Sequence, residues 1–231
     1  PPTNGRIMIK RTVSLLGIAA AGLLAFGTLQ PATAAPPPAP AGDVPKNIIY
    51  VIVDGFGPAQ IELARRMNGG SLALLDTVPW QTTTTIDSSS LEGVTDSAAG
   101  ATALASGVET LNGWVGMEPT AAGAAPVETI LERAEKAGMA TGLISDSYIT
   151  DATPASFAAH VTDRGQTKAI ASQMATQGIE FLFGGGLRQG GVADLLDDAP
   201  GVTYVTNQRQ MTSYVSSGGS GPVYGLFNSW N

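Results

Sequence analysis

The sequence has no cysteine and only one histidine, His160, among its 231 residues. The lack of cysteine excludes disulfides, cysteine-ligated zinc and thiol catalysis. Charged residues make up only 13% of the chain and hydrophobic residues 43%, so the composition favours a packed core over disorder. A zinc hydrolase usually draws on several histidines, and one histidine cannot complete such a centre alone.

The N-terminal segment predicts export. A short basic stretch, Met8–Arg11, precedes an uncharged apolar run from Leu15 to Phe26, and Ala32-Thr33-Ala34 has the small-residue pattern of a cleavage site. This order is typical of a secretory signal peptide, here residues 8–34, cut after Ala34. The apolar run is shorter than the roughly 20 residues that span a bilayer, so we expect no stable membrane anchor. The expected location is secreted or periplasmic.

Charge argues against several partners. Removal of residues 1–34 takes away three basic residues and no acidic one, which moves the formal net charge from −7 to −10. An acidic protein is a poor candidate for binding nucleic acid or an anionic membrane through its overall field. An anionic substrate would need local cations.

The rest of the chain predicts a Pro/Ala-rich tether over residues 35–45 and one domain over residues 46–231. The β-branched run Ile48–Val53 is typical of a parallel strand buried on both faces. Strands and helices then alternate, which predicts an α/β fold of three αβα layers around a mostly parallel sheet. The expected helices are 58–67, 97–106, 127–137, 154–159, 166–176 and one from 208. The other expected strands are 81–86, 140–144, 181–183, 204–205 and 223–227.

Two segments could carry chemistry at the ends of strands, where open parallel sheets bind ligands. Asp54 follows the first expected strand and could face a metal, although aspartate is also common in turns. Ser97 opens an alanine-rich helix whose free amides and positive end favour an anion. With no histidine nearby in sequence, a metal is the more natural activator of this hydroxyl. Plain helix capping by Thr95, Asp96 or Ser97 is the alternative.

A third segment offers further polar groups. Thr153 and a nearby carboxylate oxygen could bind magnesium, or Thr153 could cap a helix that Pro154 begins. Arg164 could hold two phosphate oxygens, or form a surface ion pair of little energetic value. His160 lies among apolar residues, which favours a supporting role over direct metal ligation.

Taken together, these segments resemble the bacterial and animal alkaline phosphatases. The matching stretches are Lys46–Pro58, Val94–Gly107, Asp151–Pro154 with His160–Arg164, and Phe183–Leu187. The resemblance implies that Ser97 is the nucleophile and becomes phosphoserine. Arg164 would hold the phosphoryl oxygens, and Asp96 would orient Arg164. The substrates would be small phosphate monoesters, and the full-length protein could be a homodimer.

The resemblance also implies metals. Asp54 would bridge a zinc ion and a magnesium ion, Thr153 would be a second magnesium ligand, and Asp151 would lie in the outer coordination sphere of that magnesium. The remaining ligands of two Zn²⁺ ions and one Mg²⁺ ion lie, in the family, in a C-terminal half that this sequence lacks. We therefore expect the chain to be truncated and inactive or nearly so by itself.

Two other functions remain open. A related metal-dependent phosphodiesterase or sulfatase would share the aspartate at the strand end. A sulfatase, however, needs a Cys/Ser-x-Pro-x-Arg context, and residues 97–101 lack both the proline and the arginine. A non-catalytic, secreted phosphate-binding fragment would use Arg164 and the helix at Ser97 without turnover.

Overall fold

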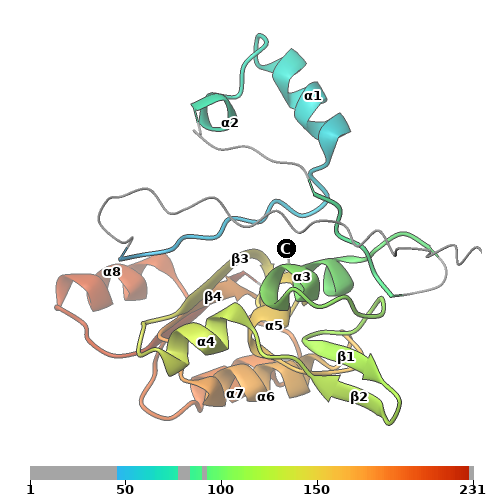
Figure 1. Ribbon diagram of the computed structural model, residues 1–231. Coiled ribbons are helices and arrows are strands. Elements are labelled where there is room, and N and C mark those ends of the chain that lie inside the picture. The colour runs from blue at the N-terminus through green and yellow to red at the C-terminus, as the bar shows by residue number, and fades with distance from the viewer. Residues whose placement is uncertain (1–45, 78–83, 90–92, 229–231) are drawn as a thin grey trace, which may run out of the picture. The chain divides into compact units, whose positions relative to one another are not determined.

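The computed structural model describes residues 46–77, 84–89 and 93–228 (Figure 1). The chain divides into two units, Pro1–Tyr50 and Val51–Asn231, and every described helix and strand lies in the second. The expected signal peptide, the tether at 35–45 and the first half of the expected strand at 81–86 lie outside the described residues. The second half, residues 84–86, has no strand assignment. Among the residues that are described, no helix combines the length and apolarity needed to cross a membrane.

A four-stranded parallel sheet forms the centre of the second unit. The strands are β3 (Gly142–Tyr148), β4 (Phe181–Gly185), β5 (Thr203–Val205) and β6 (Val223–Asn228), in the order β3-β4-β6-β5. Non-consecutive neighbours in a parallel sheet require crossover connections, and helices supply them here. The expected α/β class with a parallel central sheet is confirmed.

Side chains alternate between the two faces of this sheet. On one face, Leu182, Tyr224 and Leu226 are fully or almost fully buried. Helices α6 (Thr167–Gln177) and α7 (Val192–Asp197) run together along one side of the sheet and complete this core (Figure 1). On the other face, a hollow of about 390 Å³ is lined by residues that include Ile144, Phe183 and Phe227, with Met211 of α8 (Gln208–Ser216).

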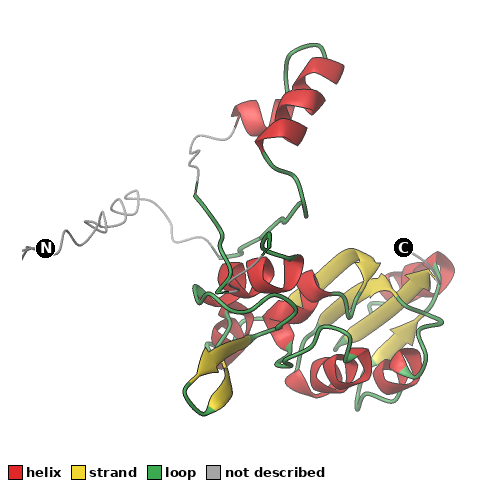
Figure 2. Ribbon diagram, turned by 90° about the vertical axis from the view of Figure 1, so that its right-hand side faces the viewer, coloured by secondary structure: helices red, strands yellow, loops and turns green. Residues whose placement is uncertain are grey.

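Of the remaining elements, all but α5 (Ala152–Ala158) precede β3 in the sequence, and α5 follows it. The elements that precede β3 are α1 (Pro58–Met67), α2 (Ala73–Thr77), α3 (Ser97–Ser106), β1 (Met117–Thr120), β2 (Gly123–Pro126) and α4 (Ile130–Lys136). Figure 2 colours helices red and strands yellow, and it shows the antiparallel β1–β2 hairpin separate from the main sheet. The sequence did not predict the hairpin, α2 or α7.

The expected first strand, Ile48–Val53, is wrong for this structure. The segment has no strand assignment, and all of its side chains except that of Ile52 are exposed, from 50% at Tyr50 to 88% at Ile49. Ile52 is partly buried and packs against the core. A strand needs a neighbour for its backbone hydrogen bonds, and no strand in the described part of the chain pairs with this segment. A β-branched run shows what a segment prefers, whereas its pairing depends on other segments.

Candidate active site

Helix α3 begins at Ser97, and Asp96 is its N-cap. The Asp96 backbone is extended, with φ −84° and ψ 171°, and its Oδ1 accepts a hydrogen bond of 2.9 Å from the Ala99 N–H. The Ser97 hydroxyl therefore lies in the first turn, beside backbone amides that have no partner within the helix. A short polar residue at the cap followed by helix-forming alanines explains why the helix begins here.

Small side chains let α3 pack closely on α5. Ala98, Ala101 and Ala105 of α3 are buried, and α5 contributes Ala155 and Ala158. A polar link crosses this contact, because the buried Ser156 hydroxyl lies 3.3 Å from both the Thr102 Oγ1 and the Ala98 carbonyl oxygen. The contact brings residues from two distant parts of the sequence into a fixed relation.

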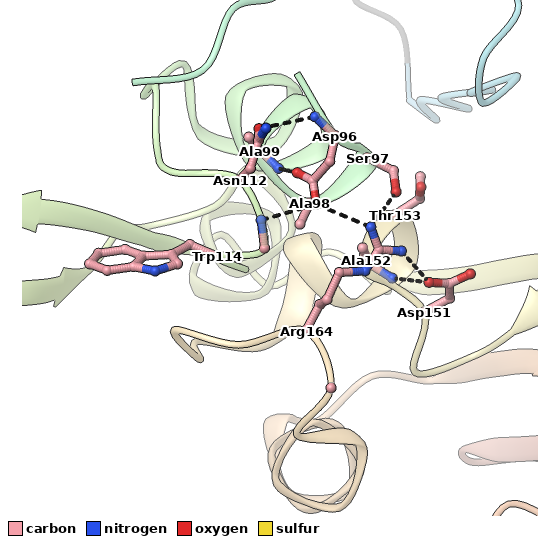
Figure 3. A network of polar contacts seen from close by, with 12 residues as sticks. Asp96, Ser97, Ala98, Ala99, Asn112, Trp114, Asp151, Ala152, Thr153 and Arg164 are labelled. Carbon is pink, nitrogen blue, oxygen red and sulfur yellow. Dashed lines mark hydrogen bonds and ion pairs between the residues drawn. The ribbon is translucent and has the colours of Figure 1, made fainter. Parts of the chain in front are cut away.

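Arg164 connects the first turns of both helices (Figure 3). Its Nη1 donates to the Ser97 Oγ at 2.9 Å and lies 3.2 Å from the Asp96 Oδ2. Its Nη2 donates to the Asp151 Oδ1 at 2.8 Å. One planar guanidinium thus contacts the hydroxyl and both carboxylates. The expected grouping of Ser97, Asp96 and Arg164 is present in the structure.

Asp151 is the N-cap of α5, so the alternative that Thr153 caps this helix is wrong. The Asp151 Oδ1 accepts from the Ala152 N–H at 2.7 Å, and its Oδ2 accepts from the Ser147 hydroxyl at 2.9 Å. Burial raises the pKa of Asp151, but these two hydrogen bonds and Arg164 outweigh burial, so the pKa is lowered overall. Its carboxylate is therefore held in the ionised form.

The pKa of Arg164 shows the reciprocal effect. Partial burial lowers it, but the hydrogen bonds and charges of Asp151 and Asp96 raise it by more, so the pKa lies above the ordinary arginine value. Arg164 therefore stays cationic at alkaline pH.

Thr153 and Asp54 meet although 99 residues separate them in sequence. The Thr153 hydroxyl donates to the Asp54 Oδ2 at 3.2 Å. Asp54 itself is exposed and follows the extended segment, where Gly55 turns the chain with a φ of 68°. A carboxylate and a hydroxyl oxygen are hard ligands of the kind that Mg²⁺ accepts, so this pair fits part of a magnesium site.

The described residues do not offer a zinc site. Across residues 46–77, 84–89 and 93–228, no group of three or more His, Cys, Asp or Glu side chains could hold a metal ion. Apart from Asp54, the zinc ligands that the resemblance implies are thus not found among the described residues.

His160 serves as a structural link. Its Nδ1 lies 2.6 Å from the Gly116 carbonyl oxygen, and its Nε2 lies 3.0 Å from the Glu132 Oε1. These contacts join the segment after α5 to the residue that precedes β1 and to α4. The expectation of a supporting role rather than direct ligation agrees with this geometry.

Sequence reasoning missed three residues that hold the site. Ser147 supports Asp151, as described above, and Asn112 and Gly113 contact the Asp96 segment. The adjacent Asn112-Gly113 pair is a strong turn signal and could have marked a turn, but nothing local to it indicates which distant residue it would contact.

Comparisons with known proteins show the family of this chain. The family model described as alkaline phosphatase matches residues 45–231. The repressible alkaline phosphatase of Saccharomyces cerevisiae is 36% identical over 216 residues, which cover 79% of this chain and 37% of that protein. The streptomycin-6-phosphate phosphatase of Streptomyces griseus is 34% identical over an alignment that covers 96% of this chain and 55% of that protein.

Solved structures give the same result. The alkaline phosphatase from the Antarctic bacterium TAB5 superposes with a TM-score of 0.54 at 34% identity, covering 63% of this chain and 42% of that one. The Thermus thermophilus alkaline phosphatase superposes with a TM-score of 0.59 at 29% identity, covering 74% and 36%. The chain spans between about a third and just over half of the length of these relatives. Because the family model matches most of the sequence, the chain belongs to the alkaline phosphatase family.

Proposed function

We propose that the protein hydrolyses phosphate monoesters through a phosphoserine at Ser97, in a metal-dependent reaction that releases inorganic phosphate. The contact between the Arg164 guanidinium and the Ser97 hydroxyl carries this proposal. It places a permanent cation with paired donors beside a serine at a helix N-terminus. Guanidinium groups bind phosphate oxygens bidentately, and helix N-termini favour anions.

The chain's own residues would act in two displacements. In the first, the Ser97 hydroxyl loses its proton to solvent and its Oγ attacks the phosphorus, the bond to the ester oxygen breaks, and the departing alkoxide takes up a proton from solvent. In the second, water attacks the phosphoserine and gives up a proton, the bond from phosphorus to Oγ breaks, the Ser97 Oγ regains a proton, and phosphate leaves. In both steps Arg164 would hold two phosphoryl oxygens in place, while Asp96 and Asp151 keep the guanidinium aimed at them.

Charge balance supports the need for metal. In the polar network around Ser97, the described residues contribute the cation of Arg164 and the carboxylates of Asp96 and Asp151, and Thr153 contacts a third carboxylate, Asp54. One positive charge against three negative charges would repel a phosphate dianion. Divalent cations would supply the missing positive charge and would lower the pKa of a bound hydroxyl or water.

Among the described residues, Asp54 and Thr153 would hold Mg²⁺. Asp151 would then lie in the outer coordination sphere of this Mg²⁺ while it also bonds Arg164. Two Zn²⁺ ions, as the family resemblance implies, would need ligands beyond the described residues.

The test uses the full-length protein and a chromogenic phosphate monoester at alkaline pH, with zinc and magnesium and then with a chelator. We expect chelation and Ser97→Ala each to abolish turnover, whereas Ser172→Ala, an exposed serine on α6, should leave it unchanged. Radiolabelled substrate, quenched in acid, should label Ser97. Turnover that survives Ser97→Ala would refute the nucleophile assignment, and phosphate binding without turnover would favour the non-catalytic alternative.

We also propose that residues 8–34 direct export, so that the mature protein is secreted or periplasmic and begins at Ala35. N-terminal sequencing of the protein from the extracellular or periplasmic fraction would test this, and an intact Met8 would contradict it. For the full-length protein, the resemblance further implies a homodimer, which light scattering would detect.

A further inference from the structure

A β-turn at Asn112 and Gly113 lies against the candidate site and is named here the Asn112–Gly113 turn. The Trp114 N–H closes it by donating to the Leu111 carbonyl oxygen at 3.0 Å. Gly113 has a φ of 82°, a conformation that residues with a side chain rarely adopt. The Trp114 side chain points away from the polar network (Figure 3). The turn therefore meets the site through Asn112 and Gly113.

The Asn112 side chain holds the segment that leads into Ser97. Its Oδ1 accepts from the Asp96 N–H at 3.0 Å, and its Nδ2 donates to the Val94 carbonyl oxygen at 2.8 Å. One amide thus bonds the backbone on both sides of Thr95. This fixes the position from which the Asp96 carboxylate projects.

Gly113 forms hydrogen bonds with both residues of the Asp96–Arg164 ion pair. Its N–H donates to the Asp96 Oδ2 at 3.0 Å, the same oxygen that Arg164 Nη1 contacts, and its carbonyl oxygen accepts from the Arg164 N–H at 2.8 Å. The turn therefore sets the spacing between the Asp96 carboxylate and the Arg164 backbone.

We propose that the Asn112–Gly113 turn is a positioning element for the candidate site. It holds Asp96 and the base of Arg164 at the separation from which one guanidinium reaches Ser97, Asp96 and Asp151 together. Neither Asn112 nor Gly113 is assigned contact with the substrate. The catalytic consequence rests on the proposed function, because a well-placed Arg164 matters to turnover only if phosphate binds there.

Loss of the Asn112 amide should loosen Arg164 without removing any group that binds phosphate. Asn112→Ala leaves the Asp96 N–H and the Val94 carbonyl without their partner, so Asp96 gains freedom. Phosphate should then bind about 3- to 10-fold more weakly, the effect of one lost neutral hydrogen bond. The value of kcat should fall as well, because a mobile guanidinium stabilises the transition state less.

Asn207→Ala provides a matched control. The Asn207 Oδ1 caps α8 by accepting from the Gln210 N–H at 3.0 Å, on an exposed helix that contributes no residue to the site. Both substitutions remove an asparagine that bonds a backbone N–H near the start of a helix, so a general loss of stability should affect both alike.

The experiment measures the order of the Arg164 side chain in ¹⁵N-labelled full-length protein, from the heteronuclear NOE of its Nε–H signal. The signal is assigned by its disappearance in Arg164→Lys. Competitive inhibition by inorganic phosphate and the values of kcat and KM are measured on the same variants.

A fall in Arg164 order, with weaker phosphate inhibition, in Asn112→Ala but not in Asn207→Ala would support the proposal. Identical values in the two variants would overturn it. If Asn112→Ala does not fold, Gly113→Ala decides in the same way, because a Cβ at Gly113 would meet nothing within 4 Å and would strain only the turn. If Ser97 is never phosphorylated, the proposed function fails, while the order of Arg164 still decides whether the turn positions it.

Discussion

Replacing Arg164 by lysine would test whether the shape of the guanidinium, beyond its charge, matters at this site. The two terminal nitrogens of Arg164 have separate contacts, Nη1 with Ser97 and Asp96 and Nη2 with Asp151. Lysine keeps the positive charge but has one nitrogen on a flexible stem. It cannot contact both carboxylates and also present two parallel N–H groups to a phosphate.

The expected weakening of phosphate binding follows from the hydrogen bonds that Arg164→Lys removes. A lysine in place of Arg164 would forfeit at least one charge-assisted hydrogen bond to the bound phosphate, and such bonds contribute about 1.5–3 kcal/mol. That range corresponds to phosphate binding weaker by roughly 10- to 150-fold. Because Arg164 is about one third exposed, we expect the lower part of the range.

The assay is calorimetric titration of the metal-loaded full-length protein with inorganic phosphate, supported by the inhibition constant in turnover. Arg209→Lys, on the exposed surface of α8, makes the same chemical change away from the site and should leave both constants unchanged. A dissociation constant for Arg164→Lys within threefold of wild type would show that the bidentate geometry is unimportant and would refute the reasoning.

Two further predictions concern the other side chains of the site. Thr153→Val keeps the side-chain shape but removes the hydroxyl, so half-maximal activity should need more Mg²⁺; a titration curve identical to that of wild type would rule out Thr153 as a ligand. The lowered pKa of Asp151 stabilises the fold at pH values above its unfolded value of about 3.9, and this contribution is lost as the pH falls through the folded pKa. Asp151→Asn keeps a helix cap and should make Tm depend less on pH between about 5 and 3, whereas an unchanged acid transition would argue against this linkage.

The sequence predicted most of the α/β elements because local patterns set them. The helices at 58–67 and 97–106 have the expected bounds, and β4 and β6 lie where the apolar runs placed them. The segment at 48–53 shows the limit of this reasoning. Its composition favours a strand, but a strand forms only beside another, and the pairing partner is a property of the whole sheet.

The site was predictable residue by residue but not as a network. Sequence order and the family resemblance brought Ser97, Asp96 and Arg164 together, and the structure agrees. They gave no indication that Asp151 would contact Arg164 directly, because that contact depends on how the segment after α5 folds back toward the start of that helix. The role of the Asn112–Gly113 turn depends on tertiary contacts in the same way.

Capping and a functional role appeared as competing explanations for Asp96, yet the structure shows both contacts on one side chain. A carboxylate has two oxygens that accept hydrogen bonds. In Asp96, Oδ1 caps α3 by accepting from the Ala99 N–H, while Oδ2 accepts from the Arg164 Nη1 and the Gly113 N–H. A serine or threonine cap has a single oxygen and no charge, so it could not combine these contacts with an ion pair. Aspartate at position 96 therefore couples the start of α3 to the position of Arg164. A substitution that keeps the cap but removes the contact with Arg164 should leave α3 capped while it releases Arg164.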